Sequence, residues 1–164
     1  MLPVETPRKA LITGASSAIG LELCRRYLSA GHSVVAQYFE NQSALTSEFA
    51  SESRLVPVQC DLADLPSVSR LGKTHTDCDI AVFLASIATP STLESLDLPR
   101  FERTLTVGAL SNYVLLSEIG SAMARRQWGR IVIGSSIGVK FGGGKDSFAY
   151  AFTKYASEFL PASV

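Results

Sequence analysis

The sequence predicts an α/β fold in which a parallel sheet is wound in both directions from its centre. Short runs of strand-forming residues alternate with longer amphipathic stretches along all 164 residues, which is typical of repeated βα units. The fourth run is apolar on both faces, as buried parallel strands are. The third run contains Pro57, which favours an edge because proline donates no ladder hydrogen bond. These observations predict a doubly wound sheet of strand order 3-2-1-4-5 in a single domain over residues 1–164.

The first half of the chain contains three expected strands and two expected helices. A strand over residues 9–13 leads into a helix over 19–30, whose apolar residues recur once per turn and form one stripe. A glycine ends that helix. A second strand is expected over 33–38, a short helix over 42–51 and a third strand over 54–60.

The second half alternates in the same way. In order we expect a short helix over residues 65–71, a strand over 79–85 and a long helix over 98 to about 127. A strand over 129–135, a glycine-rich loop over 138–144 and a last helix over 147–160 follow. Asp97 is the expected N-cap of the long helix, and Pro161 ends the last one. Since ligands of such sheets bind outside the carboxyl ends of the strands, we expect the chemistry just after residues 13, 38, 60, 85 and 135.

Composition and charge exclude several classes of function. Lys and Arg total 15, as do Asp and Glu, so no basic surface for nucleic acid is indicated. No apolar run approaches the ~18 residues of a membrane span, and the first residues form no signal-peptide core, so no membrane partner is expected. The three cysteines form no CxxC pair, which predicts reduced thiols, no metal site and a cytoplasmic protein.

A glycine turn between the first strand and the first helix is the strongest binding motif. Residues 13–20 read TGASSAIG, and glycine lets the backbone approach a pyrophosphate while the helix start offers free N–H groups. We therefore expect this turn to bind a dinucleotide cofactor through Gly14, Ser16, Ser17, Ile19 and Gly20. The alternative is an ordinary strand-to-helix turn rich in small residues. The spacing departs from GxGxxG, with Ala18 where a further glycine could stand.

Two strand ends bear on which nucleotide binds. The second strand ends at Tyr38 without a carboxylate, and we interpret the nearby Glu40 as a solvated loop charge. An acid here selects NAD, so its absence favours NADP, although no arginine follows to attract a 2′-phosphate. Asp61 follows the third strand and is expected either to accept a hydrogen bond from an adenine amino group, to cap the turn after it, or both.

Tyr150 and Lys154 stand four residues apart on the last expected helix and so share one face. A phenol of pKa near ~10 is a poor base at neutral pH, and an adjacent cation favours its ionised form. Such a pair arises by chance with a probability of roughly 0.15 in a chain of this composition, so alone it is a weak signal. Ser135 and Ser136 end the fifth strand, where a hydroxyl could polarise a carbonyl or simply cap a turn.

A serine hydrolase is the obvious competing interpretation of an exposed serine, and the sequence argues against it. The segment around Ser136 reads GSSIG rather than GxSxG. The two histidines, His32 and His75, both precede it, and we interpret both as surface residues.

With these residues in view, the chain resembles the short-chain dehydrogenase/reductase family over residues 8 to about 160. TGASSAIG is similar to its cofactor turn, CDL at 60–62 to its adenine-contacting segment, and GRIVIGSS and YAFTK to its serine strand and YxxxK helix. The resemblance implies a Rossmann-like fold that binds NAD(H) or NADP(H) and interconverts alcohols and carbonyls. It implies cofactor contacts at Tyr38, Asp61, Leu62, Ala85, Tyr150 and Lys154, with Tyr150 as general acid/base, Lys154 lowering its pKa and Ser136 orienting the substrate oxygen.

The chain also departs from that family. Residues 83–86 read FLAS where the family has NNAG, and Gly108 stands where it has an asparagine that supports a proton relay. Family members continue past the YxxxK helix, so we expect residues 1–164 to lack the segment that closes the substrate pocket and to leave the fifth strand as an exposed edge. The alternative to an oxidoreductase is therefore a non-catalytic nucleotide-binding or interaction module, or an inactive fragment of a longer reductase.

The resemblance further implies a homodimer or homotetramer paired through the long helix and the last helix. Apolar residues on these helices could cover a partner or simply the sheet: Leu105, Val114, Leu115, Phe152, Phe159 and Leu160.

Overall fold

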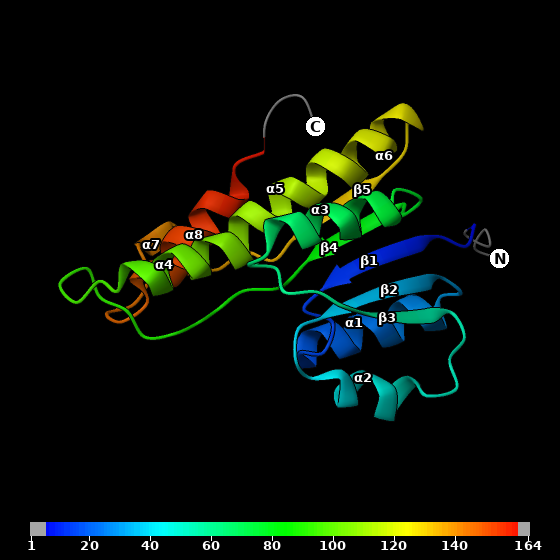
Figure 1. The fold of residues 1–164 in the computed structure, drawn as a ribbon, viewed down its shortest axis with the longest axis horizontal. Coiled ribbons are helices and arrows are strands. Elements are labelled where there is room, and N and C mark those ends of the chain that lie inside the picture. The colour runs from blue at the N-terminus through cyan, green and yellow to red at the C-terminus, as the bar shows by residue number, and fades with distance from the viewer. Residues whose placement is uncertain (1–5, 161–164) are drawn as a thin grey trace.

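The computed structural model describes residues 6–160 and contains one five-stranded parallel sheet (Figure 1). Its strands are β1 (Lys9–Thr13), β2 (Ser33–Tyr38), β3 (Leu55–Gln59), β4 (Ile80–Phe83) and β5 (Arg130–Ile133). They lie in the order β3-β2-β1-β4-β5, with every neighbouring pair parallel. The predicted order is confirmed, including the edge position of the strand that contains Pro57.

Helices cover both faces of this sheet (Figure 1). Helices α1 (Ala18–Ser29) and α2 (Gln42–Phe49) pack on one face, and α3 (Leu65–Thr74) packs on the other beside a long helical segment. Alternation along β1 separates two cores, because Leu11 faces the α3 side while Ile12 faces the α1 side. The two buried cores hold the carboxyl ends of the strands in fixed positions.

The long helix expected from residue 98 is continuous to residue 125 but is not regular. Two π-helical turns, labelled η, interrupt three α-helical parts. In chain order these are α4 (Leu98–Leu105), η1 (Thr106–Leu110), α5 (Ser111–Leu115), η2 (Leu116–Gly120) and α6 (Ser121–Arg125). The side chain of Asp97 accepts a hydrogen bond from the Arg100 N–H at 3.1 Å, which confirms the expected N-cap.

Two further helices follow β5, and one of them corrects the sequence interpretation. The glycine-rich stretch 138–144 was expected to be a loop, yet Gly138–Phe141 forms the short helix α7, which ends at Gly142 with φ of +76°. A left-handed residue without a side chain can end the helix there. Helix α8 (Phe148–Glu158) then carries the predicted Tyr and Lys pair.

His32 is also corrected, since it is buried rather than a surface residue. Its Nδ1 accepts a hydrogen bond from the Arg8 N–H at 3.1 Å, so it joins the chain ahead of β1 to the start of β2. His75 is half-buried at the end of α3. Within residues 6–160, no helix has both the length and the apolar character needed to span a membrane.

Candidate functional site

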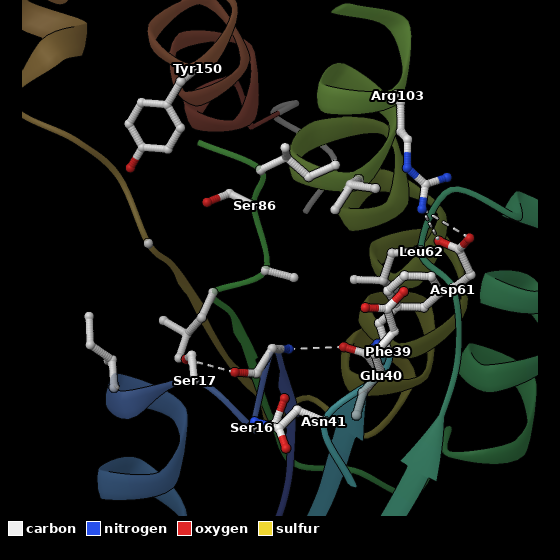
Figure 2. Close-up of a pocket in the computed structure, with 18 of the residues that line it drawn as sticks. Ser16, Ser17, Phe39, Glu40, Asn41, Asp61, Leu62, Ser86, Arg103 and Tyr150 are labelled. Carbon is white, nitrogen blue, oxygen red and sulfur yellow. Dashed lines mark hydrogen bonds and ion pairs between the residues drawn. The ribbon is translucent and has the colours of Figure 1, made fainter. Parts of the chain in front are cut away.

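A cleft of about 730 Å³ opens at the carboxyl ends of the strands, within the size range of small-molecule and cofactor sites (Figure 2). Segments far apart in the sequence form its wall. They are the turn after β1, the residues after β2, β3, β4 and β5, one side of the long helix, and the first turns of α8. This is where the sequence predicts the chemistry of a doubly wound sheet.

The turn after β1 is shaped by two glycines at which any side chain would be strained or crowded. Gly14 has φ of +66°, and a Cβ there would lie 3.1 Å from the Cα of Ala85. A Cβ on Gly20 would lie 2.4 Å from the carbonyl oxygen of Gly14, which is far inside contact distance. The hydroxyl of Ser17 accepts from the Gly20 N–H at 3.1 Å and donates to the Gly14 carbonyl at 2.8 Å. The turn therefore brings the start of α1 close against the floor of the cleft.

Gln37 locks this turn to the neighbouring strands. Its Oε1 accepts from the Gly14 N–H at 2.9 Å, and its Nε2 donates to the Cys60 carbonyl at 2.7 Å. Thr13 links the end of β1 to the residues after β4. Its hydroxyl oxygen accepts from the N–H groups of Leu84 and Ala85 at 3.1 and 3.3 Å. Both side chains are buried, so the ends of β1, β2, β3 and β4 form one hydrogen-bonded floor.

One end of the cleft, which we call the Asp61 end, combines an aromatic ring with opposite charges. The Asp61 carboxylate accepts from an Arg103 Nη2 at 3.2 and 3.4 Å, and its Oδ1 also accepts from the Ala63 N–H at 2.9 Å. The expected cap of the following turn is thus present. The Arg103 guanidinium reaches down from α4 and lies 5.7 Å from the centre of the Phe39 ring (Figure 2). Glu40 lines the cleft beside them, so it is exposed as expected but also part of the wall.

The other end, which we call the Tyr150 end, brings together a phenol and an ammonium group. Tyr150 projects its hydroxyl from α8 into the cleft (Figure 2). The Lys154 ammonium lies 5.8 Å from the centre of the Tyr150 ring and donates to the Gly134 carbonyl at 2.5 Å. Burial lowers the pKa of Lys154, because the apolar surroundings disfavour its charged form.

The two serines after β5 are placed differently from each other. Ser136, the residue assigned by resemblance, does not line the cleft, and its hydroxyl oxygen accepts from the Gly138 N–H at 3.1 Å at the start of α7. This is the capping role that the sequence left open. Ser135 does line the cleft, and its hydroxyl donates to the carboxylate of Glu158.

Most of the residues expected from the sequence meet in this one cleft, namely Gly14, Ser16, Ser17, Ile19, Asp61, Leu62, Ala85, Tyr150 and Lys154. Gly20 lies buried under the turn, and the Tyr38 side chain is buried in the core on the α1 side, so neither lines the cleft. Alternation along β2 explains this, because Gln37 faces the side opposite to Tyr38. The rest of the wall, which the sequence did not predict as cofactor-binding, is formed by Gln37, Phe39, Glu40, Asn41, Leu84, Ser86, Ile87, Arg103, Val107, Gly134 and Ser135.

The space beside Gly108, where a side chain would lie, is occupied by the neighbouring helix α8. A Cβ on Gly108 would lie 2.6 Å from the Cγ2 of Thr153, so α8 packs directly on the helix backbone here. The amide nitrogen of Asn112, one turn further on, donates to the Gly108 carbonyl at 3.0 Å. Hence no side chain from position 108 reaches the Tyr150 end.

Comparison with known proteins agrees with this geometry. The family model for short chain dehydrogenases matches residues 8–163, and the chain belongs to that family. Dehydrogenase/reductase SDR family member 11 of Bos taurus is 30% identical over 161 residues, which cover 91% of this chain and 63% of the relative. The 3-oxoacyl-[acyl-carrier-protein] reductase FabG of Rickettsia prowazekii is 26% identical over 132 residues, covering 80% and 55%.

Solved structures show the same fold. A short chain dehydrogenase/reductase family protein has a TM-score of 0.85 at 28% identity, covering 94% of this chain and 65% of its own. A protein of Beutenbergia cavernae described as an NAD(P)-dependent gluconate 5-dehydrogenase, with NADP bound at low occupancy, has a TM-score of 0.84 at 30% identity, covering 94% and 64%. The chain thus spans less than two thirds of each of these relatives.

Proposed function

We propose that the cleft binds NAD(H) or NADP(H) and serves an oxidoreductase that interconverts a small carbonyl compound and its alcohol. One observation carries the proposal: Tyr150 and Lys154 line the same cleft as the Gly14 turn. A nicotinamide cofactor bound there would supply hydride chemistry. The residues present fit such a group, since the turn at Gly14 allows close backbone approach and the rest of the cleft combines apolar surface with a few polar groups.

Residues along the cleft would hold different parts of the cofactor. The turn with Ser16, Ser17 and Ile19 would hold the phosphates at the start of α1. At the Asp61 end, Leu62 offers an apolar wall and the Asp61 carboxylate an acceptor for an adenine amino group.

Tyr150 would exchange the proton at the substrate oxygen. In reduction its hydroxyl donates a proton to the oxygen that becomes the alcohol, and in oxidation the phenolate takes that proton back. The Lys154 ammonium would place a positive charge 5.8 Å from the centre of the Tyr150 ring. The resemblance assigns Ser136 to orient the substrate oxygen. Ser135 lines the cleft instead and could take that role only if its hydroxyl left the Glu158 carboxylate.

The choice between NAD and NADP would depend on Glu40. The sequence favoured NADP because Tyr38 ends β2 without a carboxylate and Glu40 was taken as a solvated charge. With Glu40 on the wall, a 2′-phosphate bound at this end would meet a negative charge, and Arg103, which lines this end, is already paired with Asp61. Measured affinities for both cofactors are the direct way to settle the preference.

Exposed apolar side chains support a homodimer or homotetramer. Phe152, Phe159 and Leu160 are exposed on α8 and just after it, whereas Leu115 is fully buried and covers the sheet. Light scattering during size-exclusion chromatography should show a species of at least twice the monomer mass. The three cysteines are buried and unpaired, which is consistent with a cytoplasmic protein.

A non-catalytic nucleotide-binding module is the second candidate. It is favoured by the placement of Ser136, which lies outside the cleft wall with its hydroxyl oxygen bonded to the Gly138 N–H, and by the absence of a side chain at Gly108. Both candidates bind a dinucleotide, and only the first turns over a substrate.

The experiment that separates them follows NADPH and NADH absorbance with a panel of ketones and aldehydes. We expect turnover by the wild type and a loss of at least about 100-fold in kcat for Tyr150→Phe, with a much smaller change in the cofactor Kd. Tyr155→Phe, on the exposed side of the same helix, is the matched control. Tight cofactor binding without turnover across the panel would favour the module instead.

A further inference from the structure

The first turn of α8 is held by a residue from a distant loop. The Ser91 carbonyl accepts from the Phe148 N–H at 3.1 Å, and the Ser91 hydroxyl oxygen accepts from the Ala149 N–H at 2.9 Å. The Ser91 N–H in turn donates to the Asp146 carbonyl at 2.9 Å. Figure 1 shows the loop between β4 and α4 reaching the end of the molecule where α7 and α8 lie.

Helix α8 does not use the side chain at its own N-cap position. The hydroxyl of Ser147 accepts from the Gly144 N–H at 2.7 Å and donates to the Gly144 carbonyl at 3.2 Å, so it is engaged in the preceding turn. The first N–H groups of a helix have no partner within the helix and need one from elsewhere. Ser91 satisfies the first two in α8, and Tyr150 is the next residue.

The same loop also lines the cleft. Ser86 and Ile87, only a few residues before Ser91, are part of the wall that faces Tyr150. We infer that Ser91 is a positioning residue, whose hydroxyl fixes the first turn of α8 and thereby the direction of the Tyr150 hydroxyl. This inference rests on the proposed role of Tyr150.

Other contacts keep α8 in place when this hydroxyl is lost. The Phe101 ring of α4 stacks on Phe148 with 5.8 Å between ring centres and packs in a tilted arrangement on Phe152 with 5.4 Å. Lys154, one turn beyond Tyr150, has its own hydrogen bond to the Gly134 carbonyl. Loss of the Ser91 hydroxyl should therefore loosen the turn that carries Tyr150 without releasing the helix or Lys154.

The test compares Ser91→Thr with Ser91→Val, which have the same shape and differ in the hydroxyl. Ser95→Ala is the control, because the Ser95 hydroxyl bonds only within the loop, to that of Thr92 at 2.7 Å. We expect the Ala149 amide to exchange about fivefold faster in the Val variant than in the Thr variant. The NMR signals of the Tyr150 ring, assigned with Tyr150→Phe, should shift in the Val variant alone.

With a substrate in hand, kcat should fall severalfold in the Val variant while the NADPH Kd stays the same. If the wild type turns over no substrate, the proposed chemistry fails, and amide exchange and the ring signals still decide the role of Ser91. Equal exchange in the Thr and Val variants would overturn the inference. Faster exchange with unmoved Tyr150 signals would overturn it too, since Ser91 would then be a cap and nothing more.

Discussion

The carboxyl-end edge of the sheet is buried around Gly14 but exposed around β5. The floor around Gly14 is made of buried groups, with Gln37 and Thr13 hydrogen-bonded to the neighbouring strand ends. Strand β5 and the residues after it are exposed, since Val132 in the strand and Ile137 and Phe141 beyond it are 48%, 75% and 69% exposed. Under the proposed function, cofactor binding would depend on a buried, hydrogen-bonded floor, whereas the chemistry at Tyr150 would take place beside an exposed apolar surface. Changes in the floor should therefore affect binding and stability most.

The largest effect is expected for Gly20→Ala in that floor. The added methyl would overlap the Gly14 carbonyl, so we expect a loss of at least about 3 kcal/mol in the free energy of unfolding and no measurable cofactor binding. Gly120→Ala is the matched control, because its Cβ would meet only Leu116 Cδ2 at an ordinary 3.8 Å and alanine favours a helix. Urea unfolding and NADPH fluorescence titration measure both effects. Normal NADPH affinity in Gly20→Ala would contradict the placement of the cofactor.

Gln37→Met should have the next largest effect. It leaves the Gly14 N–H and the Cys60 carbonyl without their side-chain partner, and we expect a loss of about 2 to 4 kcal/mol in unfolding free energy. Gln42→Met, on the exposed start of α2, is the control and should change stability little. If the two variants unfold at the same urea concentration, the floor is not hydrogen-bonded as described.

Lys154→Met tests the Tyr150 end of the cleft. It should change the free energy of unfolding less than the two variants above, and should raise it rather than lower it. Burial of the ammonium lowers the pKa of Lys154, so the folded protein binds its proton less well than the unfolded chain. We expect the variant to be about 1 kcal/mol more stable at neutral pH, yet to bind cofactor more weakly. As pH rises toward the ordinary pKa of lysine, the wild type gains stability and the gap closes. If the difference in unfolding free energy between the variant and the wild type grew with pH, it would contradict a lowered pKa of Lys154.

The smallest effect is expected at the rim of the Asp61 end. Glu40→Gln removes a negative charge from the wall, so NADPH affinity should rise about threefold relative to NADH, less so at high salt. Glu52→Gln is the control, because its carboxylate is engaged by Arg54 and lies outside the cleft wall. Paired titrations with the two cofactors give the ratio. If the ratio of NADPH to NADH affinity did not change, Glu40 would have no influence on which cofactor binds.

The sequence predicted those parts of the fold and site that depend on local pattern. The turn at Gly14, the Asp97 cap and the face shared by Tyr150 and Lys154 follow from residues close together in the chain. The strand order followed from crossover rules and Pro57.

What it missed depends on contacts between distant residues or on a shift of one residue. Arg103 reaches Asp61 across 42 positions, and Ser91 reaches Ala149 across 58, so neither contact has a local signal. Ser135 rather than Ser136 lines the cleft, and both follow the end of β5, where the alternation of a strand no longer predicts which residue faces the cleft. The same alternation in β2 could have separated Gln37 from Tyr38 in advance.

The most direct test of the central claim is a titration of isotope-labelled protein with NADPH and with NADH, followed by NMR. If one cleft holds the whole dinucleotide, amide signals of the Gly14–Gly20 turn and of Gly134 and Tyr150 should shift together with a single Kd. Shifts confined to the turn, with Gly134 and Tyr150 unmoved at saturation, would contradict it.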